Sequence, residues 1–282
     1  MREQVPWPLG TSTGWARRIM IDTHCHLASE RFDEDRADVL RRAREAGVTD
    51  LVVPAVAPAD FGPIRALAGP GSGLHAAFGI HPQLLPELPA SADDLALGLL
   101  DSALAAGGVV AVGECGLDGP SAEAGAPMSR QVALLRAQLA LARRHGLPVL
   151  LHCLKAHDVL LAVLESEPLP AGGILHSWSG SEQQIPPFAR LGFGFAFAGP
   201  ITYENARRGP AAARAVPREL LLLETDAPDQ TPRPHHGRCE PAHLREVADG
   251  VARALGTTRE EVDALTTANA RRILRLPDAR RP

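Results

Sequence analysis

Two histidines, His24 and His26, stand two positions apart in the stretch IDTHCHL, where a short apolar run ends. Side chains at positions i and i+2 of a β-strand point to the same face, so both imidazoles can reach one metal ion while Cys25 points the other way. An isolated His-x-His pair is weak evidence, because neighbouring histidines at a strand end often form only polar surface. The pair therefore needs partners elsewhere in the chain.

Such partners follow four later apolar runs, each of which ends in an imidazole or a carboxylate. They are Glu114 in VVAVGECGLD, His152 in PVLLHC, His176 in GGILHSWSG and Asp226 in LLLETDAP. A titratable group beside a buried run normally needs a compensating partner, and solvation alone does not explain so many strand ends of this kind. We therefore predict that these residues form one metal centre with the histidine pair.

Short apolar runs alternate regularly with amphipathic helical stretches, and this alternation positions the candidate ligands. Eight runs lie at about 18–24, 48–56, 74–80, 108–114, 147–152, 171–176, 192–199 and 219–226, and two helices are expected after them, at about 240–255 and 258–275. Alternating strands and helices pair in parallel. Eight such units favour a closed (β/α)8 TIM barrel over a doubly wound sheet, and all the candidate ligands fall at the C-terminal strand ends, where such barrels carry their active sites.

Length and composition fit one large domain, since the chain has 282 residues of which 45% are hydrophobic. We place the barrel at 20–276, a flexible N-terminal extension without a signal-peptide core at 1–19, and a C-terminal tail at 277–282. No apolar run reaches about 18 residues, so no membrane span is expected.

The spacing of the cysteines and the net charge exclude some kinds of metal site and of nucleic-acid binding. The four cysteines contain no C-x-x-C pair, which argues against a structural zinc ribbon and favours a reduced, cytoplasmic protein. The net charge of −4 argues against a broad basic face for long duplex DNA. No obligate protein partner is predicted.

An ordered set of motifs resembles the TatD family of metal-dependent hydrolases, from about Met20 to Leu276. The motifs are DTHCHL, GIHP (79–82), GECGLD (113–118), LHC (151–153), HSWSG (176–180), ETDAP (224–228), GRCEP (237–241) and TANARRIL (267–274). The resemblance implies two metal ions, one held by His24, His26, Glu114 and Asp226 and the other by Glu114, His152 and His176, with Glu114 as the bridge.

The chemistry of these residue types agrees with that assignment. Two divalent cations can activate a water and stabilise the charge of a phosphoryl transition state, and a bridging carboxylate offers one oxygen to each ion. Mixed imidazole and carboxylate ligands suit zinc, manganese or iron, and magnesium suits oxygen-rich versions; the sequence does not choose among them. Because the histidines are committed as ligands, we expect Asp226 to serve also as the general base.

Asp22 and Glu224 are expected to support the ligands. They share strand parity with His24 and Asp226, so they should lie one layer deeper in the barrel and hydrogen-bond a ligand histidine. The alternative is a buried carboxylate that is satisfied by backbone groups or by an arginine.

Five residues are candidates for substrate contact. His81 has the strand parity to face the pocket and contact substrate; the alternative is that it caps the next segment. Trp178 can offer a stacking face to a base; the alternative is that it only packs against neighbouring side chains. The loop after the eighth strand is basic, in a position where such barrels often bind phosphate, although a solvated loop is the alternative. Its candidates are Arg233 and Arg238, beside His235 and His236, and the sole lysine, Lys155, is a further one.

Three positions depart from the family pattern. Leu154 stands where many members have arginine, Gly119 where tyrosine is frequent, and Cys239 where asparagine is common. None is a predicted metal ligand, so the departures weaken the case for the family's nuclease substrates and leave metal-dependent hydrolysis intact.

The resemblance therefore implies a TatD-like deoxyribonuclease, a 3'-5' exonuclease that acts on single-stranded or frayed DNA ends. An alternative within enzymes is the hydrolysis of an amide, ester or lactone by the same centre. A catalytically idle barrel that serves as a binding module is the alternative from another class, and the complete ligand set argues against it.

Overall fold

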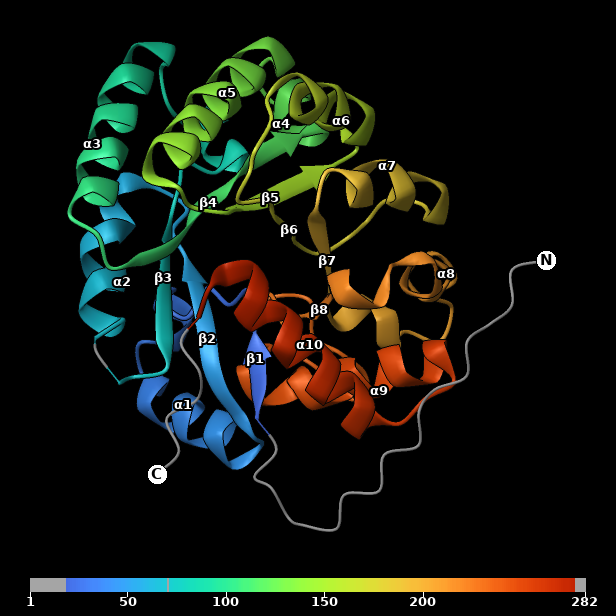
Figure 1. Ribbon diagram of the computed structural model, residues 1–282. Coiled ribbons are helices and arrows are strands. Elements are labelled where there is room, and N and C mark those ends of the chain that lie inside the picture. Colours follow the sequence, from blue (N-terminus) through green and yellow to red (C-terminus); the bar gives the residue numbers. More distant parts are fainter. Residues whose placement is uncertain (1–18, 70, 277–282) are drawn as a thin grey trace.

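The computed structural model describes residues 19–69 and 71–276, so the extension expected before residue 19 and the tail expected at 277–282 lie outside the described residues. Eight strands form one parallel sheet in chain order (Figure 1). They are β1 Met20–Asp22, β2 Val48–Pro54, β3 Leu74–Phe78, β4 Val109–Asp118, β5 Val149–Leu154, β6 Gly173–Leu175, β7 Phe193–Phe197 and β8 Leu221–Leu223.

Backbone hydrogen bonds just beyond the strand ends join the first strand to the last. Thr23 N donates to Leu223 O at 3.1 Å, and Asp226 N donates to His24 O at 2.9 Å. These bonds bring the two edges of the sheet together into a nearly closed barrel, so the predicted (β/α)8 fold is confirmed.

Ten helices surround the sheet within the described ranges (Figure 1). Helix α5 ends at Gly146, which has a φ of +66° that glycine adopts without strain. The two helices expected after the last strand are α9 and α10. The full set is α1 Arg36–Glu45, α2 Phe61–Leu67, α3 Asp93–Ala105, α4 Gly119–Glu123, α5 Met128–His145, α6 His157–Ser166, α7 Ile185–Arg190, α8 Arg208–Ala215, α9 Leu244–Leu255 and α10 Arg259–Leu274.

The barrel has two hydrophobic cores, one outside the sheet and one inside it. The larger lies between the strands and the surrounding helices. The smaller fills the barrel interior, where each strand contributes one residue: Ile21, Val52, Ala77, Ala111, Leu150, Ile174, Ala196 and Leu222. Side chains from the end of α10 (Ala270, Ile273 and Leu274) pack against this inner layer. Helix α10 therefore closes the N-terminal end of the barrel, and side chains above the inner layer face the C-terminal end. Within the described ranges, no helix is both long and apolar enough to cross a bilayer.

Several strands are shorter than the apolar runs suggested. Because β1 ends at Asp22, β6 at Leu175 and β8 at Leu223, the four candidate ligands His24, His26, His176 and Asp226 lie in the first residues beyond the strands. The same-face rule for a strand therefore does not explain the approach of His24 to His26. The turns of the backbone bring them together, and Asp226 itself has a left-handed φ of +54°, a conformation that aspartate tolerates better than most residues.

Candidate metal centre

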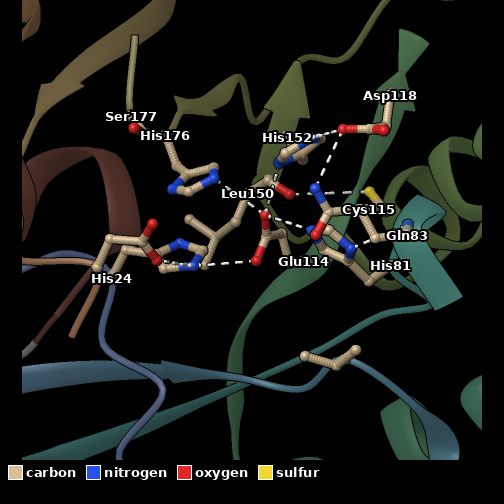
Figure 2. Close-up of polar contacts among 12 residues, drawn as sticks. His24, His81, Gln83, Glu114, Cys115, Asp118, Leu150, His152, His176 and Ser177 are labelled. Carbon is tan, nitrogen blue, oxygen red and sulfur yellow. Dashed lines mark hydrogen bonds and ion pairs between the residues drawn. The ribbon is translucent and has the colours of Figure 1, made fainter. Parts of the chain in front are cut away.

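Glu114 of β4 lies at the middle of the site, with its side chain 1% exposed and its two carboxylate oxygens facing different groups (Figure 2). Its Oε2 is 3.0 Å from His24 Nε2 and 3.4 Å from His26 Nε2. Asp226 Oδ1 completes this side, at 3.7 Å from His24 Nε2 and 3.6 Å from His26 Nε2. Two imidazoles and two carboxylates thus converge on one small volume.

The other oxygen of Glu114, Oε1, faces three more imidazoles. His176 Nε2 lies 3.0 Å away, His152 Nδ1 lies 3.2 Å away, and His81 Nε2 lies 2.8 Å away. Figure 2 shows these rings arranged around the carboxylate. The same carboxylate therefore connects two sets of donor atoms, one on each oxygen.

Close contact between β4 and β5 brings His152 to Glu114. The ladder pairs Gly116 with His152, and a Cβ atom on Gly116 would lie 2.0 Å from the carbonyl oxygen of His152. Gly116 also has a φ of +146°, which side chains other than glycine rarely adopt. The second glycine of the GECG motif is therefore required by the approach of the two ligand-bearing strands.

The unpaired donor atoms fit a bound cation. Glu114 Oε2 is fully buried and accepts no hydrogen bond, although His24 Nε2 and His26 Nε2 lie 3.0 and 3.4 Å from it. Buried polar atoms are normally paired, and lone pairs that converge without bonding one another are what a cation between them would satisfy. Donor atoms within 4.8 Å of one another form three overlapping groups: His24, His26 and Asp226; His24, Glu114 and His176; His81, Glu114 and His152.

Electrostatics keep the central carboxylate ionised. Burial by itself raises the pKa of Glu114, but the imidazoles of His81 and His176 and then His24 outweigh burial and hold that pKa well below its usual range. Glu114 is therefore a carboxylate anion at neutral pH, as a candidate metal ligand must be. Mixed nitrogen and oxygen donors suit zinc, manganese or iron.

Carboxylates behind the ligand histidines fix their orientation. Asp118 Oδ2 lies 2.8 Å from His152 Nε2, and Glu224 Oε1 lies 3.2 Å from His176 Nδ1. The structure thus places Glu224 where the sequence suggested. Asp118 was missed, although it shares strand parity with Glu114, a signal that was available in GECGLD.

Asp22 does not support a ligand ring; it is a buried carboxylate that other groups of the protein satisfy. Its carboxylate accepts hydrogen bonds from the backbone N–H and the hydroxyl of Thr225, at 3.0 and 2.6 Å, and from the backbone N–H of His24 at 3.2 Å. Burial raises the pKa of Asp22 to about 7 against these bonds. Asp22 therefore holds the backbone of the His24 loop and does not contact a ligand ring.

His81 both caps the segment that follows it and faces the centre. Its Nδ1 accepts a hydrogen bond from Gln83 N at 3.1 Å. Since Nδ1 is the acceptor, the proton of a neutral ring is on Nε2, which donates to Glu114 Oε1. In this tautomer His81 offers no lone pair to a metal ion, so its proximity does not make it a ligand.

A cavity of about 810 Å³ opens above the ligands. Sequence reasoning missed several of its lining residues, namely Arg31, Gln83, Asp229 and Gln230. Arg31 donates to Asp229 Oδ1 at 2.7 Å and to Pro228 O at 3.1 Å, so it is paired with the loop that carries Asp226. The lone arginine of the sequence loop ASERF gave no signal of this role.

Comparison with known proteins agrees with the geometry. The family described as TatD related DNase matches residues 21–275. The chain belongs to the TatD family. It is 40% identical to the uncharacterized metal-dependent hydrolase YjjV of Escherichia coli K12 over 251 residues, which are 83% of this chain and 94% of that protein. It is 34% identical to the 3'-5' ssDNA/RNA exonuclease TatD of Erwinia billingiae over 268 residues, which are 92% of this chain and 100% of that protein.

The fold comparison gives the same family. The crystal structure of YjjV, a TatD homolog from Escherichia coli K12, superposes with a TM-score of 0.85 at 36% identity and covers 93% of this chain and 99% of that one. The resemblance drawn from the motifs is therefore confirmed, and the chain is a TatD-family metal-dependent hydrolase.

Among the departures from the TatD pattern, Leu154 alone changes the cavity wall, which it lines. Gly119 opens α4, and Cys239 is buried with its Sγ 3.9 Å from Thr225 O. None of the three is a candidate metal ligand.

Two predicted substrate contacts of this TatD-family chain, Trp178 and Arg238, are held mainly by contacts within the protein. Trp178 is only 7% exposed and packs edge-on against the rings of His157, Phe188 and Phe195, but it also lines a cavity next to the metal cavity, so its contact with a base stays a prediction. Arg238 donates to both carboxylate oxygens of Asp35 and to Glu240, and its guanidinium lies over the Phe32 ring, so it is not free to bind phosphate.

The other two basic candidates lie away from the centre. Lys155 is exposed, and neither it nor Arg233 is among the lining residues of the metal cavity. Arg233 contacts His236 Nδ1 at 2.8 Å and lies over the Tyr203 ring, 5.6 Å from its centroid. Neighbouring His235 pairs with Glu246 at 3.3 Å. The basic loop is therefore held largely by contacts within the protein.

Proposed function

We propose that this chain is a two-metal phosphodiesterase that removes nucleotides one at a time from the 3' end of single-stranded or frayed DNA. The observation that carries the proposal is the placement of Glu114, whose two buried oxygens each face a separate set of imidazole donors. The similarity to a relative named as a 3'-5' ssDNA/RNA exonuclease supports the choice of substrate.

The residues divide between two ions. His24, His26, Asp226 and Glu114 Oε2 would hold one ion, and Glu114 Oε1, His152 and His176 would hold the other. When bound, divalent cations supply Lewis acidity for the phosphoryl oxygens and a nucleophilic water at neutral pH.

The protein's own groups provide orientation and proton transfer. Asp226 lines the cavity with its carboxylate 13% exposed, so it can accept the proton of an attacking water while it faces His24 and His26. Its second oxygen, Oδ2, accepts a hydrogen bond from the Gln230 amide, which fixes the direction of the carboxylate. His81 presents an Nε2–H to the centre and can donate to a phosphoryl oxygen that replaces Glu114 as its acceptor.

The charge of the cavity favours a strand end over a long duplex. Asp60, Glu87 and Asp229 line it beside the metal ligands, and the lining arginine, Arg31, is paired with Asp229. A long duplex track requires many phosphate contacts, which this rim does not offer. A single terminal phosphodiester at the metal centre does not need them.

One specific observation favours a second candidate function. Leu154 gives the cavity an apolar wall where many TatD proteins are expected to have a cation. Hydrolysis of a small amide, ester or lactone by the same centre is therefore the second candidate.

The test compares both substrate classes on the metal-loaded protein. A short, 5'-labelled single-stranded oligonucleotide should yield a ladder of products shortened from the 3' end with Mg²⁺, Mn²⁺ or Zn²⁺. The ladder should disappear on adding chelator and in Asp226→Asn, while Asp38→Asn, the same change on an exposed residue of α1, should retain it. Turnover of small esters or lactones without any oligonucleotide cleavage would favour the second candidate. No uptake of metal would favour a binding module.

A further inference from the structure

A second cavity of about 760 Å³ adjoins the metal cavity. The two share three lining residues, Ser177, Ser179 and Gln230. Beyond this shared wall the second cavity is bounded by the end of β7 and by the segment 198–209, with Phe197, Ile201 and other apolar side chains on its walls. The two cavities are therefore direct neighbours at the mouth of the barrel.

The two cavities differ in charge. The metal cavity carries carboxylates that are not metal donors, whereas the charged lining residues of the second cavity are Arg207 and Arg208. Both arginines are exposed. Neither has a carboxylate partner among the residues that the structure describes, and Arg208 donates at 3.4 Å to the backbone oxygen of Ser179. A polyanion that leaves the metal centre therefore meets positive charge in this direction.

An aromatic ring stands at the rim of the second cavity. Tyr203 is 40% exposed, which is unusual for a large side chain in this protein, and it lines the cavity. Its hydroxyl donates to Thr231 O at 3.3 Å and Arg233 lies over its ring, so its orientation is fixed. A fixed, accessible ring beside unpaired arginines is the combination that single-stranded nucleic acids use for base stacking and backbone contact.

We propose that the second cavity binds the nucleotide that precedes the scissile phosphodiester of a single strand. Its base lies against Tyr203 and the apolar wall, and the next phosphate lies at Arg207 and Arg208. The volume falls within the range of about 300–1,000 Å³ that is typical of small-molecule pockets. This proposal rests on the proposed function and adds the direction in which the strand is bound. The terminal nucleotide occupies the metal cavity, and the remaining strand extends through the second cavity.

Substitutions of Tyr203 and of the two arginines distinguish the contribution of base stacking to binding from the contribution of charge. Tyr203→Ala should weaken binding of a fluorescein-labelled oligodeoxythymidine by about 5- to 160-fold, because one stacked base is lost, and Tyr203→Trp should restore it. Arg207→Ala/Arg208→Ala should also weaken binding, and should reduce the slope of log K against log salt by about 0.7, since the two arginines hold one phosphate and each phosphate contact of a single strand contributes about 0.7. Tyr203→Ala should leave that slope unchanged.

The measurement is fluorescence anisotropy in the Asp226→Asn background, in which the strand is not cleaved. The matched control, Arg190→Ala/Arg253→Ala, removes the same charge at exposed positions that line neither cavity. It should match the parent protein. In the protein with Asp226 intact, the ratio of kcat/KM for the oligonucleotide to that for bis(p-nitrophenyl) phosphate should fall in both test variants.

The outcomes distinguish this proposal from the function on which it rests. Normal binding, salt slope and selectivity in both test variants, in a protein that does degrade oligonucleotides, would overturn the role of the second cavity and leave the nuclease assignment standing. A parent protein that neither binds nor cleaves the strand with any of the three metals would overturn both.

Discussion

The substitution Asp118→Asn, which replaces one carboxylate oxygen by an amide nitrogen, should prevent His152 from binding a metal ion. Asp118 Oδ2 lies 2.8 Å from His152 Nε2, on the far side of the ring from the Nδ1 that faces Glu114. Burial raises the pKa of Asp118, but hydrogen bonds from His152 and Ser121 outweigh burial and lower it, so the group is a carboxylate and only accepts. His152 therefore has its proton on Nε2 and its lone pair on Nδ1.

Asp118→Asn should reverse this tautomer. Asp118 Oδ1 accepts two hydrogen bonds from Ser121, from its N–H and its hydroxyl, both at 2.7 Å. The carbonyl oxygen of asparagine must stay in that position, so the amide nitrogen faces His152. An N–H donor there requires a lone pair on Nε2, which transfers the ring proton to Nδ1 and directs it at the metal position. Loss of a partner that orients a ligand histidine costs about 10- to 100-fold in metal affinity, or about 1.4–2.8 kcal/mol.

Glu224→Gln is the matched control, because the same exchange of atoms leaves the tautomer unchanged. Glu224 Oε1 accepts from Ser177 N at 2.6 Å and from His176 Nδ1 at 3.2 Å, whereas Oε2 has no partner. The carbonyl oxygen of glutamine can remain at the Oε1 position, so His176 still donates from Nδ1. Metal affinity should change little. Burial of an amide without an acceptor should lower the free energy of unfolding by about 1–3 kcal/mol.

The assay is metal titration of the chelator-stripped protein by calorimetry, with elemental analysis of bound ions after desalting. We expect Asp118→Asn to weaken one of two binding steps and Glu224→Gln to weaken neither. If both variants lost the same metal affinity, or if Asp118→Asn kept full metal affinity, the proposed change of the His152 tautomer would be refuted.

Three further outcomes are expected. Glu114→Ala should abolish uptake of both ions whereas His81→Ala should retain it, and elemental analysis that finds two ions in the Glu114 variant would exclude a bridging role. A chain that begins at Met20 should keep its melting temperature and activity, because little apolar surface is lost; a fall of several degrees would show that the preceding residues pack on the barrel. Arg238→Leu should lower the urea midpoint at pH 7. Hydrogen bonds from Arg238 hold the pKa of Asp35 at about 2, so this difference from the parent should shrink as the pH falls from about 4 to about 2, and a constant difference would contradict it.

The barrel and the ligand positions could be predicted from the sequence because both depend on local pattern. Eight apolar runs separated by helical stretches specify the order of the strands, and a histidine or carboxylate that ends such a run, as His152 does, is placed at the C-terminal rim. Parity along β4 would also have identified Asp118. These signals need only the period of a strand and the polarity of neighbouring residues.

The environment of individual polar and aromatic side chains could not be predicted in the same way. Arg238 binds Asp35, a residue about 200 positions earlier in the chain, and nothing near either residue indicates that pairing. Trp178 shares parity with His176, but β6 ends at Leu175 and Ser177 has a left-handed φ of +42°, so the parity rule does not apply here. Short strands and left-handed turns are what limit the prediction at this rim.

The arginines around the site divide by whether they already have carboxylate partners, and this division determines where a phosphate can bind. Arg31 and Arg238 pair with Asp229, Asp35 and Glu240, and through these contacts they hold the loop that begins with Asp226. A phosphate at either guanidinium would have to displace an existing ion pair and loosen a metal ligand. Arg207 and Arg208 have no such pairing within the described ranges, so they can contact a phosphate without disturbing the centre. We therefore expect an anionic substrate to bind on the side of the barrel mouth where Arg207 and Arg208 lie.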